Sequence, residues 1–131
     1  MRYSSAFARP EDTYRAVDLA GRTGGEDPAG LVSLLYAEAS RALRTAAWAA
    51  EHRRFDVKSE RVTRALSILF ALEGGLDFDK GGEVSKTLAR VYQGARAELV
   101  EASLDADPKR FIAIAETIEE IAAAWETVRR G

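Results

Sequence analysis

The sequence predicts an all-α protein, an antiparallel up-down four-helix bundle preceded by a short N-terminal helical or capping segment. Apolar residues recur at three- and four-residue steps over four long segments, which is the period of a helix with one buried face. Short connections join these segments, so neighbours in the chain should run antiparallel. No segment shows the sustained apolar and polar alternation of a strand. The length of 131 residues is that of one domain with a sizeable core.

The composition excludes several classes of function. The net charge of -2 gives no electrostatic reason to expect binding to nucleic acid or to an anionic membrane. The absence of cysteine excludes disulfides, thiolate nucleophiles and Cys-ligated zinc. No apolar run approaches the roughly 18 residues that indicate a membrane span, so membrane insertion is not expected. We therefore expect a protein of the cytosol.

The N-terminal part of the chain differs from the rest. Glycines and prolines interrupt every periodic pattern before Leu31, and we expect residues 1–26 to form a flexible cap segment and residues 27–131 to form the bundle. One short helix is expected around residues 13–20, where Tyr14 and Val17 supply apolar anchors.

Two helix starts are clearly marked. Asp27 precedes Pro28 and Asp107 precedes Pro108, and an N-cap aspartate followed by proline in the first turn is typical of a helix beginning. The remaining helix boundaries are predicted from the periodic pattern of apolar residues between these two starts. The expected helices run from about 28 to 52, from about 56 to a weak end at 74–75, from about 83 to 104, and from 108 to beyond 125.

The pattern of residues from Leu76 to Glu83 predicts the end of one helix followed by a turn. Asp77 and Asp79 are poor residues for a helix interior, and Gly81 and Gly82 can turn the chain at positive φ. Glu83 suits the positive end of the next helix. The pattern therefore predicts helix, turn and helix at this point.

The helices differ in the width of their apolar faces. With about 100° of rotation per residue, the large apolar residues of the third helix span about 100° and those of the fourth about 140°, as in ordinary core-facing helices. The second helix spans about 200°, because Ile68 and Phe70 fall on opposite sides of Leu66 and Leu69. The first helix is also wide. One neighbouring helix cannot cover apolar faces of this width. Three explanations are open: the N-terminal segment covers the additional apolar surface, another protein covers it, or the helix is central in the bundle and packs against two neighbours.

These features resemble the flagellar secretion chaperone family, FliS, from about Asp27 to Val128. The motifs that carry the resemblance are Leu76–Glu83 with Leu88, Val91, Tyr92 and Leu99, together with Leu34-Leu35-Tyr36 and Ala123-Ala124-Trp125. The chain departs from the family at Tyr36-Ala37-Glu38, where Tyr-Asp-Gly is usual, at Thr87-Leu88, where Asn-Leu is usual, and at Gln93-Gly94. These departures affect individual contacts more than the fold.

The resemblance implies a chaperone without catalytic activity or cofactor. It implies that the bundle binds the C-terminal segment of newly made flagellin in apolar grooves, prevents premature polymerisation, and meets the flagellar type III export gate with flagellin bound. It also implies that the N-terminal segment occupies part of the groove, with Tyr14 and Val17 as the plug. The sequence leaves open whether the free chain forms a homodimer.

The wide faces and the edge tyrosines lead to a predicted groove. A tyrosine at the edge of an apolar stripe buries its ring and still offers its hydroxyl to a bound backbone. The predicted flagellin-binding residues are Leu35, Tyr36, Leu66, Ile68, Leu69, Leu72, Leu76 and Tyr92.

The alternative interpretation is a helical signalling adaptor or a histidine phosphotransfer module. His52 is the only histidine, and such modules place lysine and glycine one turn after theirs, which this chain lacks. A surface or capping histidine is the simpler interpretation. A di-iron bundle needs two Glu-x-x-His units, so one histidine excludes it, and no metal site is predicted. Trp125 should pack in the core, whereas Trp48 is a candidate for contact with a partner.

Overall fold

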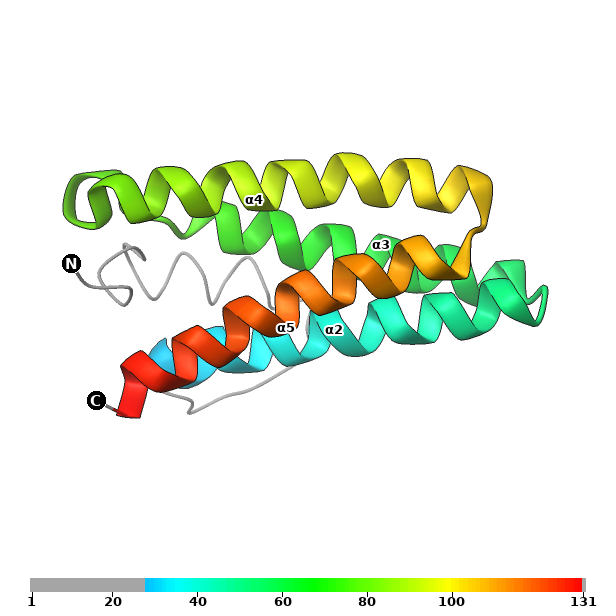
Figure 1. Cartoon of the computed structure of the whole chain (residues 1–131), viewed down its shortest axis with the longest axis horizontal. Coiled ribbons are helices and arrows are strands. Elements are labelled where there is room, and N and C mark those ends of the chain that lie inside the picture. The colour runs from blue at the N-terminus through cyan, green and yellow to red at the C-terminus, as the bar shows by residue number, and fades with distance from the viewer. Residues whose placement is uncertain (1–27, 131) are drawn as a thin grey trace.

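The computed structural model describes residues 28–130, which form four long helices (Figure 1). Each helix runs antiparallel to the one before it, so the turns after the first and third helices lie at the same end (Figure 1). This confirms the predicted all-α four-helix bundle. The division of the chain at residue 26 stays a prediction, because the N-terminal segment lies outside the described residues. The helices are α2 (Pro28–Glu51), α3 (Phe55–Gly74), α4 (Phe78–Asp105) and α5 (Pro108–Arg130).

Helix α2 is the central element of the bundle. It packs extensively against both α3 and α5, while α4 completes the ring by contacting α3 and, less extensively, α5. Alanines in its second half, such as Ala42 and Ala46, are fully buried and allow the close approach of two neighbours. The wide apolar face of this helix is therefore the stripe of a central helix covered from two sides.

The two flanks of α3 have different environments. Ile68 is fully buried in the core, whereas Phe70 is 67% exposed and carries the guanidinium of Arg96 at 5.6 Å from its ring centroid. The wide apolar face predicted for α3 therefore combines a core residue on one side, Ile68, with a surface residue on the other, Phe70. Arg96 and Gln93 of α4 also bond to Glu73 of α3.

The turn between α3 and α4 is shorter than predicted. Helix α4 begins at Phe78 and not at Glu83, because Asp77 acts as its N-cap and accepts a hydrogen bond from the Lys80 N–H at 2.9 Å. The prediction of a loop as far as Glu83 was wrong, since it took both aspartates as helix breakers and overlooked that Asp77 can act as an N-cap. Gly82 interrupts the helix at φ 52° and ψ -126°, as the positive-φ prediction required.

The start of α5 confirms the predicted cap. The Asp107 side chain accepts a hydrogen bond from the Lys109 N–H at 3.0 Å, directly beside Pro108. Arg110 in the first turn then reaches three carboxylates near the end of α4, those of Glu98, Glu101 and Asp105. These contacts fix the α4–α5 turn.

Two glycines of α4 should respond to alanine in opposite directions. A Cβ added at Gly82 or Gly94 would meet no atom within 4 Å, so backbone conformation alone decides the outcome. We expect Gly82→Ala to lower the free energy of unfolding by about 1–2 kcal/mol, because its φ is positive. Gly94→Ala should raise it by about 0.5–1 kcal/mol, because Gly94 is an exposed residue inside a helix. Urea denaturation measures both. An equal effect of the two substitutions would contradict the assigned turn.

Candidate functional site

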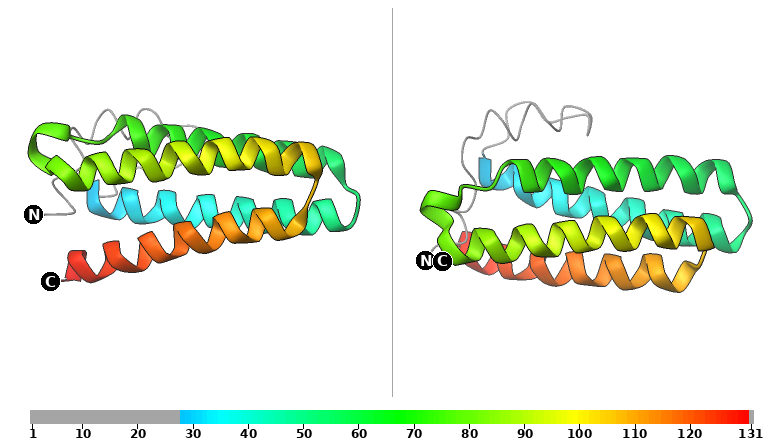
Figure 2. Two further views of the ribbon diagram at one scale, coloured as in Figure 1. Left: turned by 45° about the horizontal axis from the view of Figure 1, so that its top comes forward. Right: turned by 90° about the horizontal axis from the view of Figure 1, so that it is seen from above.

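A groove follows the seam between α4 and α5. Figures 1 and 2 show the two helices close together at their connecting turn and further apart toward the start of α4 and the end of α5. A hollow of about 480 Å³ lies in the diverging part, and a second of about 290 Å³ lies nearer the turn. Both include Val91, so we treat them as one α4/α5 groove. Its lining residues are Glu83, Val84, Thr87, Leu88, Val91, Gly94, Ala95 and Glu98 from α4, and Ala113, Ile114, Thr117, Glu120, Ile121 and Ala124 from α5.

The groove has an apolar floor and partly accessible apolar walls. Leu88 and Ile114 lie almost fully buried at its base, whereas Val84, Val91 and Ile121 are only half-buried. The remaining positions on the walls are mostly alanine, glycine or threonine, whose short side chains do not fill the space between diverging helices. The surface thus offers a strip of apolar side chains that the bundle covers incompletely.

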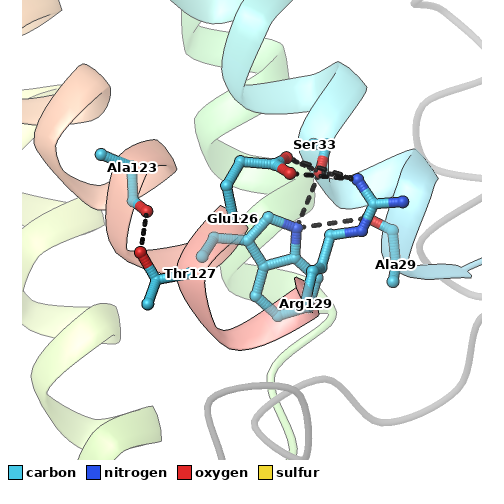
Figure 3. A network of polar contacts seen from close by, with 7 residues as sticks. Ala29, Ser33, Ala123, Glu126, Thr127 and Arg129 are labelled. Carbon is cyan, nitrogen blue, oxygen red and sulfur yellow. Dashed lines mark hydrogen bonds and ion pairs between the residues drawn. The ribbon is translucent and has the colours of Figure 1, made fainter. Parts of the chain in front are cut away.

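Polar contacts hold the end of α5 against α2. The Trp125 indole N–H is directed at Ser33 Oγ (2.9 Å) and at the Ala29 carbonyl oxygen (3.2 Å), while Ser33 also donates to Glu126 (2.5 Å). Arg129 lies beside the same serine and glutamate (Figure 3). The Ser33 hydrogen bond, together with Arg129, holds the pKa of Glu126 below its usual value against the opposing effect of burial.

A second link joins the middle of α5 to α2. The Arg44 guanidinium binds both carboxylate oxygens of Glu119, at 2.7 and 2.8 Å, and Ser40 donates to the same carboxylate. The Arg44 hydrogen bond is the largest cause that lowers the pKa of Glu119, which falls to about 2. These links bind α5 to α2 and leave its opposite side free to diverge from α4.

Another hollow, of about 430 Å³, lies between α2 and α5. It is lined by Tyr36, Ala37, Ser40, Arg41, Glu119, Ala122, Ala123 and Glu126. Its charged residues are already paired, Arg41 with Glu38, Glu119 with Arg44, and Glu126 with Arg129. The α4/α5 groove is the larger candidate for binding a peptide, and fewer of its lining residues are engaged in ion pairs.

Comparison with known proteins identifies the family. Residues 10–131 match the family described as "Flagellar protein FliS". The chain belongs to the FliS family. It is 28% identical over 115 residues to a flagellar secretion chaperone FliS of Vibrio cholerae, and the match covers 88% of this chain and 85% of that protein.

Two further relatives have the same type of name. The flagellar secretion chaperone FliSB of Pseudomonas aeruginosa is 26% identical over 115 residues, covering 88% of this chain and 91% of its own length. The FliS of Salmonella typhimurium is 28% identical over 116 residues, covering 88% and 86%. These matches confirm the resemblance found in the sequence. Because FliS relatives are named as chaperones, a non-enzymatic class, they also confirm the prediction of a protein without catalytic activity.

The structure places most of the predicted flagellin-binding residues in the core. Leu66 is half-buried, and the seven others are at most 6% exposed. The hydroxyls of Tyr36 and Tyr92 lie 2.7 Å apart, so they bond to each other and are not directed at solvent. These residues do not form an accessible surface, and their contact with flagellin stays a prediction. The predicted plug residues Tyr14 and Val17 lie outside the described part of the chain. The buried set is Leu35, Tyr36, Ile68, Leu69, Leu72, Leu76 and Tyr92.

The α4/α5 groove was missed because sequence periodicity does not show how far two helices diverge. Both helices have apolar faces of ordinary width, so we predicted that neither had surplus surface. The available signal was the alternation of apolar residues with small ones, such as Thr117 and Ala124 beside Ile121 on α5.

The remaining candidates are accounted for by local contacts. His52 is exposed, and its Nδ1 lies 2.8 Å from the Trp48 carbonyl oxygen, so this nitrogen donates and caps the end of α2. The Trp48 ring is 48% exposed and stacks on the imidazole, with centroids 4.5 Å apart. Trp125 is 2% exposed, as predicted for a core residue.

Residues 28–130 contain neither a candidate metal site nor a candidate membrane span. No group of acidic or histidine side chains in this range is arranged to hold a metal ion. Within the same residues, no helix has the length and apolar character needed to cross a bilayer.

The Glu119–Arg44 pair should make stability depend on pH. Because the pKa of Glu119 is lower in the folded chain than its ordinary value of 4.5, its stabilising effect is complete above about pH 4.5 and is lost as pH falls toward 2. Glu119→Gln should therefore lower the free energy of unfolding at pH 7 by about 0.5–1 kcal/mol, a modest value because the pair is partly exposed. The difference from the unsubstituted protein should shrink between pH 4.5 and pH 2 in chemical denaturation.

Glu120→Gln is the matched control. Glu120 is the adjacent glutamate, is exposed, and has no ion-pair partner within the described residues, so its substitution should leave stability nearly unchanged at every pH. A difference for Glu119→Gln that does not vary with pH would contradict this assignment.

Proposed function

We propose that this chain is a chaperone that binds the C-terminal segment of newly made flagellin in the α4/α5 groove. In this proposal it prevents premature polymerisation in the bacterial cytosol and presents the bound flagellin to the flagellar type III export gate. The observation that carries the proposal is an open apolar groove on a member of the FliS family. The hollow between α2 and α5 is smaller than the α4/α5 groove, and the charged residues that line it are already paired within the bundle.

The groove suits a segment that folds as it binds. A disordered tail with apolar residues at helical spacing gains a folded structure by laying its apolar face into a groove between two helices. The half-buried side chains of Val84, Val91 and Ile121 would then become part of a continuous apolar core with the tail. The apolar surface through which flagellin polymerises is covered at the same time, and no covalent chemistry is needed.

The proposed site differs from the set predicted from sequence. The buried core residues support the groove from below: Leu88 at its base belongs to the same apolar cluster as Leu69 and Tyr92. Side chains that are inaccessible in the bundle then influence binding by fixing the positions of α4 and α5. Direct contact is assigned to the half-buried residues of the groove walls.

Val91 offers the sharpest test, because it lines both hollows. We expect Val91→Gln to weaken binding of the isolated flagellin C-terminal segment by about tenfold or more, since a polar side chain would lie in the apolar interface. Titration calorimetry with the full chain measures this loss, and a delay of flagellin polymerisation gives a second readout.

The matched control is Val100→Gln. Val100 is also on α4 and is 49% exposed, but it lies outside the groove lining, so its substitution should leave affinity unchanged. Equal losses for the two variants would contradict the assigned site. Failure of the unsubstituted protein to bind the segment would contradict the proposed function itself. Thermal unfolding of each variant shows whether the bundle is intact.

A further inference from the structure

We infer that the α4/α5 groove selects a client helix that carries lysine or arginine beside its apolar face. This inference rests on the proposed function and extends it, because it states which chemical feature of the flagellin segment the groove recognises besides apolar surface. It depends on the charges that surround the groove and on which of them are already neutralised.

The charged residues that line the groove are all acidic. Glu83 stands on the α4 wall and Glu120 on the α5 wall of the larger hollow, and Glu98 stands on the α4 wall of the smaller one. No lysine or arginine belongs to either lining. A helix placed between these walls therefore has an acidic group on each side at the wide end of the groove.

The two ends of the groove differ in how far their acids are neutralised. At the narrow end, Arg110 binds Glu98 at 2.8 Å and also contacts two further carboxylates. At the wide end, the carboxylate of Glu120 has no partner within the described residues, and the side chain of Glu83 is 82% exposed with Lys86 at 3.4 Å. An exposed pair three residues apart on a helix is weak, so Glu83 remains available to a client. The negative charge of the groove lining is thus less compensated at the wide end than at the narrow end.

A bound helix would bring its own charges close to these carboxylates. When its apolar face covers the groove floor, the residues that flank this face lie beside the groove rims, where Glu83 and Glu120 are. Covering the floor also excludes water from one side of each rim, which strengthens charge interactions there. Lysine or arginine at the flanks is then favoured, and aspartate or glutamate is disfavoured by like-charge repulsion.

The test compares two forms of the flagellin C-terminal segment on the full chain. One form is unaltered, and in the other its lysines and arginines are replaced by glutamine. The rim variant is Glu83→Gln with Glu120→Gln. We expect it to bind the unaltered segment about threefold to tenfold more weakly than the unsubstituted chain does, as for two partly exposed ion pairs. The glutamine form should bind both proteins equally.

The matched control is Glu60→Gln with Glu116→Gln. These exposed glutamates lie outside both groove linings, and the double change removes the same total charge. The control should bind the unaltered segment as the unsubstituted chain does. The preference for the unaltered segment should also decrease between about 50 mM and about 500 mM salt, since partly exposed charges are screened.

The outcomes separate this inference from the proposed function. Equal losses for the rim variant and its control, or an equal loss for both segments, would overturn the inference. If the unaltered segment binds and Val91→Gln weakens it, but the rim variant does not, the groove assignment stands and only the charge selection fails. If the segment does not bind the unsubstituted chain at any salt concentration, both proposals fail.

Discussion

The attachment of α5 to α2 is the interaction on which the candidate site depends. Trp125 is buried in the core while its indole N–H bonds to Ser33 and Ala29, and Glu119, six residues earlier on α5, binds Arg44. These contacts place one face of α5 firmly on the central helix. Since a straight helix cannot follow two neighbours that point in different directions, α5 then diverges from α4, and the groove is the space that results.

Helix packing leaves apolar side chains accessible in the groove while the core of the bundle remains complete. Large exposed apolar areas are costly in a soluble protein unless a partner covers them. Here the half-buried strip lies between helices whose other faces are held by a continuous core, so the bundle forms without a partner and still leaves apolar side chains accessible to one. A carboxylate stands on each side of the wide end. In our proposal this charge opposes association between copies of the groove and favours a basic partner.

Sequence reasoning was most accurate where local signals act alone. The predicted cap at Asp107 and the predicted positive φ of Gly82 follow from backbone hydrogen bonds and sterics within a few residues. The cap at Asp77 was missed, because this segment was predicted to be a loop. The predicted groove residues were chosen by the width of apolar faces, and this criterion cannot separate a central helix from a binding helix. Leu35 and Tyr36 show the difficulty, because two neighbours in the bundle bury them fully.

The sequence by itself determined four amphipathic helices, their antiparallel order and, through its motifs, membership of the FliS family. These properties depend on helical period, short connections and residue identity, all of which can be read along the chain. The tertiary structure decided which apolar residues remain accessible, because accessibility depends on the relative tilt of α4 and α5. That tilt is set by contacts between residues more than 70 positions apart, such as Arg44 with Glu119 and Ser33 with Trp125.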